Sequence, residues 1–136
     1  MRNLILPGFI VFIIMMGSCQ KDDSSSFSTS STTTTTTAII KITVTDGLGS
    51  TQAFMTVDMF DHEISLTQQN TVIKSAISNT NGVATFNMEN LATNIPKTYY
   101  FGVFKQVGID YILQGSRTVE GVVAGKEIDA NLVLIN

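Results

Sequence analysis

The side chains most able to do chemistry lie close together near the middle of this sequence. Asp58, Asp61, His62 and Glu63 fall within six residues and include the only histidine of the chain. Carboxylate oxygens can hold Ca²⁺, and an imidazole beside carboxylates can hold a transition metal. The spacing follows no known metal-binding loop, and adjacent residues seldom all point inward. We therefore interpret the stretch as a solvated loop and expect no metal and no cofactor.

Nucleophilic catalysis requires a nucleophile, a base and an orienting group, and the sequence offers few candidates for these roles. The only thiol is that of Cys19, and the serines are concentrated in a polar segment that cannot position them. Asp58 and Asp61 are a conceivable carboxylate pair for glycoside hydrolysis, but a small domain offers little cleft between them. We expect no catalytic residues, and a metal-binding or hydrolytic domain ranks third among the hypotheses.

The N-terminal residues have the layout of a secretion signal. A short positive start is followed by an apolar run over 4–16, which as a helix would measure roughly 20 Å and is too short to span a bilayer core of about 30 Å. The motif Met16-Gly17-Ser18-Cys19 resembles the lipobox of bacterial lipoproteins. This resemblance implies a signal peptide over 1–18, cleavage between Ser18 and Cys19, and a lipid on the Cys19 thiol.

The residues that follow the cysteine are polar. Gln20, Lys21, Asp22 and Asp23 resemble the export signal that sends lipoproteins of one Gram-negative lineage to the outer face of the outer membrane. Attachment facing the periplasm is the alternative. Serine and threonine dominate 24–37, which cannot bury enough surface to offset the entropy of ordering. We expect 19–37 to be a lipidated cysteine and a disordered tether, and glycosylation of the tether stays open.

Residues 38–136 alternate between apolar and polar side chains and lack helical periodicity. Asp46-Gly47 and Asn81-Gly82 are strong turn signals between alternating runs. Leu91, in a long connection, is expected to plug the core. The sequence predicts an all-β fold, a small antiparallel β-sandwich of seven or eight strands. Strands are predicted near 40–44, 53–59, 71–78, 83–88, 99–105, 111–115, 117–123 and 128–134.

The order of these signals carries a second resemblance. One strand ends in Asp-Gly at 46–47, and the next, 53–59, begins with a small residue. A turn then precedes an aromatic in 78–86, with Ser-Asn where Thr-Asp is usual, and the aromatic-rich strand 99–103 follows. This order resembles the transthyretin-like, carboxypeptidase-regulatory-like sandwich family. The resemblance implies a module over 38–134 that serves as a spacer, an adhesive unit or a docking domain.

The aromatic-rich strand supplies the candidate binding surface. Because successive side chains of a strand point to opposite faces, Tyr100 and Phe104 face outward if Tyr99 and Phe101 face the core. Gly102 between the two outward rings would leave a shallow groove in which a ring or a peptide could sit. Tyr100 and Phe104 are therefore the predicted contact residues.

The charge pattern limits the class of partner. The net charge is −3 and the basic residues are scattered, which argues against nucleic-acid binding. We expect a non-enzymatic surface lipoprotein, held to the membrane by its lipid, whose sandwich contacts a protein or glycan or joins an envelope assembly. The alternative is a purely structural, lipid-anchored spacer. An exposed patch around Tyr100 and Phe104 would favour binding. A uniformly polar surface would favour the spacer. A deep pocket beneath Asp58, Asp61 and His62 would favour metal binding or catalysis.

Overall fold

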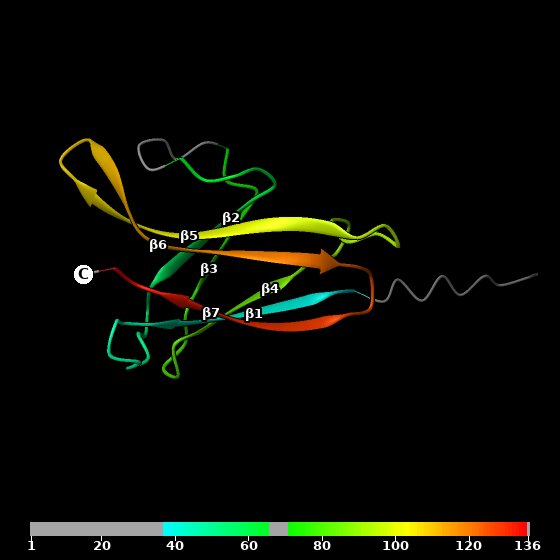
Figure 1. The fold of residues 1–136 in the computed structure, drawn as a ribbon, viewed down its shortest axis with the longest axis horizontal. Helices are drawn as coiled ribbons and strands as arrows, with labels where there is room; N and C mark the ends of the chain where they lie inside the picture. The colour runs from blue at the N-terminus through cyan, green and yellow to red at the C-terminus, as the bar shows by residue number, and fades with distance from the viewer. Residues whose placement is uncertain (1–36, 66–70, 136) are drawn as a thin grey trace, which may run out of the picture. The chain divides into compact units, whose positions relative to one another are not determined.

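The computed structural model describes residues 37–65 and 71–135. The predicted signal peptide, Cys19, residues 20–23 and the tether up to Thr36 lie outside the described residues. Within the described ranges the chain forms seven strands that pack as two sheets, so the predicted β-sandwich is confirmed (Figure 1). The strands are β1 (Ile39–Thr45), β2 (Thr56–Phe60), β3 (Lys74–Ile77), β4 (Val83–Asn87), β5 (Lys97–Val107), β6 (Asp110–Val122) and β7 (Glu127–Val133).

No helix in the described ranges is both long enough and apolar enough to span a bilayer.

The two sheets have the strand orders β4-β1-β7 and β3-β2-β5-β6. Neighbouring strands are antiparallel except β1 and β7, which run parallel with Ile40 opposite Ile128 and Ile42 opposite Ala130. This one pair differs from the antiparallel pairing that the sequence predicts. Its cause is the short connection 123–126, which crosses from the end of β6 to the other sheet and starts β7 at the same end of the sandwich as β1 (Figure 1).

The core lies between the sheets and is built from alternate residues of their strands. Ile40, Ile42 and Val44 of β1 are fully buried. Phe86 of β4 and Phe101 of β5 come from opposite sheets, and their rings meet edge to face with centroids 5.0 Å apart. The buried cluster runs from Ala38 to Leu134, and residues 34–136 form one compact unit. The segment 34–136 therefore carries a whole core of its own.

Two turns follow the sequence signals closely. The Asp46 carboxylate accepts hydrogen bonds from two backbone N–H groups of its own turn, each at 2.9 Å. The Asn79 side-chain oxygen does the same in the turn before β4, at 2.9 and 3.1 Å. Gly82 in that turn has φ of 78°, and a Cβ there would lie 2.8 Å from the Thr51 Cβ. Only glycine meets both the conformation and the close approach.

Some strand limits differ from those predicted. β2 begins at Thr56 and not at Ala53, because Phe54 adopts φ of 60° and its N–H donates to the Ser78 carbonyl at 2.9 Å. β3 is shorter than the predicted 71–78. The two predicted strands 111–115 and 117–123 are one continuous strand, β6. Leu91 is half-buried against the core, as its predicted role requires.

The ring contact between the sheets gives a stability prediction. Phe101→Ala is expected to lower the free energy of unfolding by about 3–5 kcal/mol, because it removes a buried ring and leaves a cavity. Urea denaturation of the segment 34–136 measures this. Thr85→Ala, at an exposed position of β4, is the control and should change stability by less than about 0.5 kcal/mol. A loss below about 1 kcal/mol for Phe101→Ala would contradict the role given to this ring.

Candidate functional site

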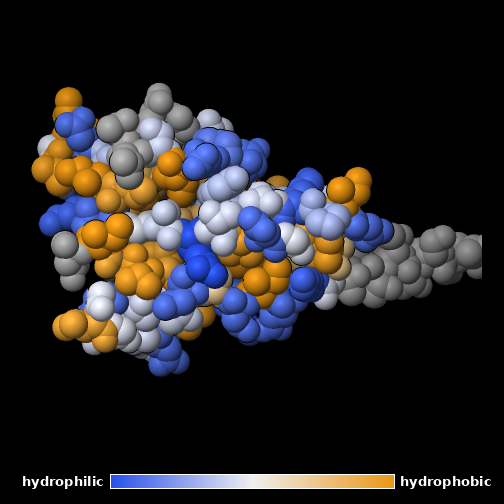
Figure 2. All heavy atoms as spheres, viewed as in Figure 1, coloured by the Kyte–Doolittle hydropathy of each residue, from blue (hydrophilic) through white to orange (hydrophobic). Residues whose placement is uncertain are grey.

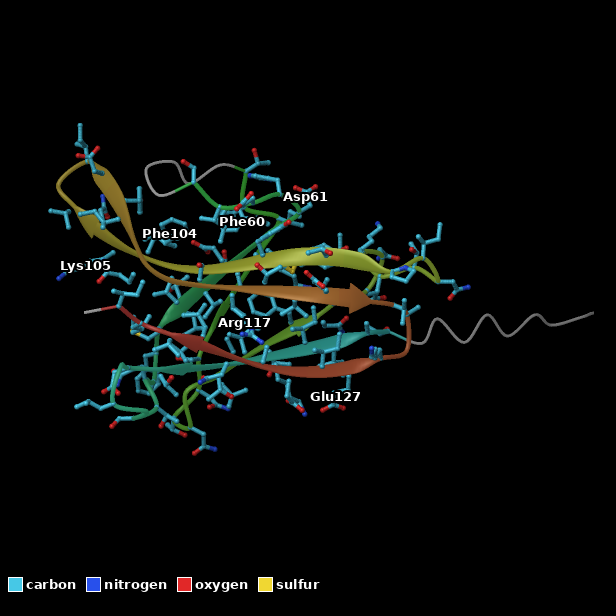
Figure 3. The ribbon with its side chains drawn as sticks, in the orientation of Figure 1. Phe60, Asp61, Phe104, Lys105, Arg117 and Glu127 are labelled. Carbon is cyan, nitrogen blue, oxygen red and sulfur yellow. The ribbon has the colours of Figure 1, made fainter. Side chains whose placement is uncertain are left out.

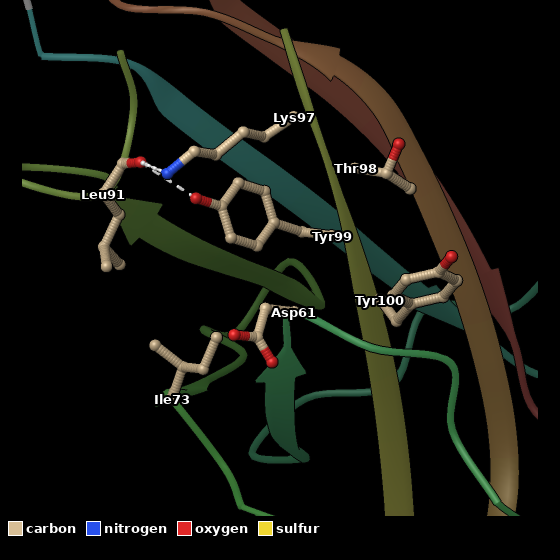
Figure 4. A pocket seen from close by; sticks show the side chains of 7 residues that line it. All are labelled: Asp61, Ile73, Leu91, Lys97, Thr98, Tyr99 and Tyr100. Atoms are coloured by element: carbon tan, nitrogen blue, oxygen red, sulfur yellow. Dashed lines mark hydrogen bonds between the residues drawn. The ribbon is translucent and has the colours of Figure 1, made fainter. Parts of the chain in front are cut away.

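Strand β5 sends successive aromatic side chains to opposite faces of its sheet. Tyr99 and Phe101 are buried in the core, whereas Tyr100 is half-buried on the outer face. Figure 4 shows the Tyr99 and Tyr100 rings on opposite sides of the strand. The predicted outward orientation of Tyr100 is therefore confirmed, and this ring is available for contact from outside the sandwich.

The groove predicted over Gly102 does not exist, so that prediction was wrong. A Cβ at Gly102 would lie 2.9 Å from the Phe104 ring and 3.0 Å from the Ile64 side chain. Phe104 is itself half-buried and meets Phe60 edge to face, with ring centroids 6.0 Å apart (Figure 3). The cause is the segment after β2, which returns over the sheet. We call Phe60, Ile64, Phe104 and Leu113 the outer cluster.

Phe60 carries the signal that could have revealed the outer cluster. It shares the outward parity of Asp58 in β2, yet it is fully buried and is absent from the core between the sheets. A large apolar residue in an otherwise polar outward row needs cover from elsewhere. His62 provides part of that cover, since its ring and that of Phe60 meet edge to face with centroids 5.8 Å apart. Phe104 is thus partly used for packing, and Tyr100 is the better contact residue.

The larger of two hollows beside Tyr100 has a volume of about 460 Å³. Ligand pockets commonly range over about 300–1,000 Å³. Its wall includes Tyr99, whose hydroxyl donates to the Leu91 carbonyl at 2.9 Å, and Lys97, whose amine donates to the same oxygen at 3.3 Å (Figure 4). The Asp61 side chain lies at the opposite wall, beside Ile73. This hollow thus combines a carboxylate, an ammonium group and apolar walls.

The ionisable groups of this hollow are shifted in opposite senses. A hydrogen bond of 2.9 Å from the His62 ring holds the pKa of the Asp61 carboxyl below its ordinary value of 3.8, and the positive charge of Lys97 acts in the same direction. Burial raises the pKa of Tyr99, and the Asp61 charge raises it further. At neutral pH the hollow therefore presents an ionised carboxylate beside an uncharged phenol. Neither group is placed to exchange protons near neutral pH.

A second hollow, of about 100 Å³, lies on the other side of Tyr100. It is bordered by Glu63 and by Ser116 and Thr118 of β6, and Thr118 is the direct cross-strand partner of Tyr100. Arg117 of β6 borders it too. Tyr100 is the residue that borders both hollows.

The residues that could hold a metal or act as catalysts are not gathered in one place. Asp58 is buried and accepts a hydrogen bond of 2.5 Å from the Ser75 hydroxyl. Asp61 and Glu63 border different hollows, so neither hollow holds the facing carboxylates that glycoside hydrolysis needs. His62 contacts Asp61 and Phe60, and neither offers a hydroxyl or thiol for the imidazole to deprotonate. Among residues 37–65 and 71–135 no three His, Cys, Asp or Glu side chains come together as metal ligands.

A comparison of the chain with models of known protein families gives no match. A comparison with curated proteins gives no match either.

The Asp61–His62 contact gives a prediction about pH. His62→Ala should raise the pKa of the Asp61 carboxyl toward 3.8, because the largest cause of its lowering is removed. A carbon-13 NMR titration of the carboxyl group measures the change. Glu63→Gln is the control, and it should leave the pKa of Asp61 lowered. Since folding depresses this pKa, the contact stabilises the fold above the unfolded pKa, and the gain disappears as pH falls through the folded pKa. An unchanged Asp61 titration in His62→Ala would contradict this account.

Proposed function

We propose that this chain is a non-enzymatic, lipid-anchored envelope protein whose sandwich binds a glycan on the face around Tyr100. The observation that carries the proposal is the position of Tyr100 between two hollows that each contain polar side chains. A sugar ring has an apolar face and a rim of hydroxyl groups. An aromatic ring flanked by carboxylate and hydroxyl groups complements both, and few such groups suffice to orient a ligand.

Each side chain of this face has a distinct role in the proposal. The Tyr100 ring stacks on one sugar face. The Ser116 and Thr118 hydroxyls and the Glu63 carboxylate bind sugar hydroxyls in the smaller hollow, and Asp61 does so in the larger one. Hydrogen bonds to charged groups are stronger than those between neutral groups, so the carboxylates contribute most to orientation. The paired strands β5 and β6 hold Tyr100 opposite Thr118, so little conformational entropy is lost on binding.

The surface also supports binding over the alternative of a structural spacer. A spacer needs only a polar, solvated exterior. This domain instead has two hollows beside Tyr100, and on the outer face Ile64 packs over Gly102. The resemblance of 38–134 to transthyretin-like, carboxypeptidase-regulatory-like modules agrees with this role, since such modules include adhesive and docking domains.

The anchoring part of the proposal rests on the N-terminal sequence. The lipobox-like motif ending in Cys19 supports lipidation, and residues 20–23 support display on the outer face of the outer membrane, with periplasm-facing attachment as the alternative. The stretch 20–37 would span roughly 24 Å on average as a flexible chain. A tether of that reach would let the folded domain meet glycans outside the bilayer.

Replacing the lipid-bearing thiol tests the anchor. Cys19→Ala should move the protein from the detergent phase to the aqueous phase, or leave it as an uncleaved precursor, because no acyl chains are attached. Detergent phase partitioning and mass spectrometry of the N-terminus measure the two outcomes. Ser26→Ala, in the same polar stretch, is the control and should partition as the native protein does. Equal detergent partitioning and processing of Cys19→Ala and native protein would contradict lipidation.

Removing the stacking ring tests the binding face. A glycan array identifies the oligosaccharide that the segment 34–136 binds best, and titration calorimetry gives its affinity. Tyr100→Ala should weaken that affinity about tenfold, or about 1.4 kcal/mol, because the ring supplies the apolar contact. Tyr111→Ala, an exposed tyrosine that borders neither described hollow, is the control. Binding to no glycan, or equal losses for the two variants, would refute the proposed site.

A further inference from the structure

Exposed hydrophobic side chains are concentrated at one end of the sandwich. In the described part of the chain ten large hydrophobic side chains are exposed, and nine of them lie at the end opposite Ala38, where the chain enters the domain. We call this the distal end. Leu48 is 94% and Ile109 is 92% exposed there, and Phe54 and Ile135 are also largely exposed. Figure 2 shows hydrophobic residues on the surface at this end.

The strand registers define the distal end. Thr45 of β1 lies beside Val133 of β7, Thr56 of β2 opposite Ile77 of β3, and Val107 of β5 opposite Asp110 of β6. The two sheets are joined here by the Ile135 N–H, which donates to the Gln114 carbonyl at 2.6 Å. The tenth exposed hydrophobic residue, Ile95, lies at the other end, in the connection between β4 and β5.

Four of the nine exposed side chains lie outside the strands, those of Leu48, Phe54, Ile109 and Ile135, and the other five lie at or near strand ends. Leu48 lies in the turn that the Asp46 carboxylate closes, and the Phe54 N–H donates to Ser78. Ile109 lies in a two-residue hairpin turn in which Gly108 has φ of 67°. Backbone groups that enter lipid must already be paired, because the bilayer core offers them no partner. The Leu48 and Phe54 N–H groups meet that condition.

The charge at the distal end is low. Of the described charged residues, Asp46, Lys105 and Asp110 lie there, and the Asp46 carboxylate already accepts hydrogen bonds from its own turn. A surface that binds anionic lipid by charge carries a cluster of basic residues. The distal end has none among its described residues, so its attraction to a bilayer would come from apolar burial.

We propose that the distal end inserts its loop tips into a lipid bilayer with zwitterionic headgroups. A protein partner needs a complementary shape, and neither described hollow lies among these tips. A fluid bilayer needs no complementary shape and accepts separate protruding side chains. The same membrane could hold a lipid on Cys19, since residues 20–37 reach at most about 63 Å and the 13-residue β6 spans about 43 Å. This inference does not depend on glycan binding.

Vesicle flotation with two matched substitutions tests the inference. The segment 34–136, which lacks the signal peptide and Cys19, should float with phosphatidylcholine vesicles, equally at low and high salt. Ile109→Asp should reduce the bound fraction at least tenfold. Ile95→Asp places the same change at the other end and should have no effect. Tyr100→Ala should float normally, which separates this test from that of the glycan site.

Tryptophan fluorescence gives a second measurement that also suits the full chain, because the protein has no tryptophan of its own. With vesicles, the tryptophan emission of Ile109→Trp should shift to shorter wavelength and be quenched by brominated lipid. The emission of Ile95→Trp should show neither change. Absence of flotation together with absence of this shift would overturn the inference. Equal losses of the vesicle-bound fraction in Ile109→Asp and Ile95→Asp would also overturn it. A dimer in light scattering that Ile109→Asp abolishes, without vesicle binding, would assign the distal end to contacts between proteins.

Discussion

Packing of the inner faces of the two sheets against each other is the interaction on which this domain depends. The only cysteine of the chain is Cys19, which cannot form an intrachain disulfide, and the described residues hold no metal cluster. Stability must therefore come from burial, and a domain of about 100 residues can bury enough. β1 and β5 each lie between two neighbours in their sheets, so their alternate side chains contribute the centre of the core.

The alternation that fills the core also leaves the other face of each strand free for other roles. Tyr99 and Phe101 anchor β5, and their burial holds Tyr100 outward between the two hollows. Side chains of β2 alternate between the two faces in the same way, but its outward Phe60 is covered by Phe104 and the segment after β2. A sandwich of two thin sheets thus gains a small second apolar layer, which supports one wall of the candidate binding face.

Much of the fold could be predicted from the sequence because strand alternation is local. The rows of β1, β5 and β7, the turns at Asp46 and Asn81, and the outward position of Tyr100 all follow from side chains within a few residues. The parallel pairing of β1 with β7 could not be predicted in this way, since it depends on a crossover between the two sheets. The start of β2 depends on a bond from Phe54 to Ser78, far along the chain.

The candidate site was less predictable because its walls come from distant segments. Asp61 and Lys97 meet at one hollow only when β2 and β5 pair, and Ile64 fills the space over Gly102 only when the segment after β2 turns back. The hydrophobic distal end is hidden for the same reason. Leu48 and Ile109 look like isolated surface residues in the sequence, and the strand registers alone bring their turns to one end.

Amide hydrogen exchange over the segment 34–136 tests most directly whether one core between the two sheets carries the stability. Exchange protection reports the free energy of local and global opening at each residue. The account predicts the slowest exchange in the middle of β1 and β5, and faster exchange in the short edge strand β3 and at the tip of the β5–β6 hairpin. Exchange in β1 as fast as at the hairpin tip would contradict it.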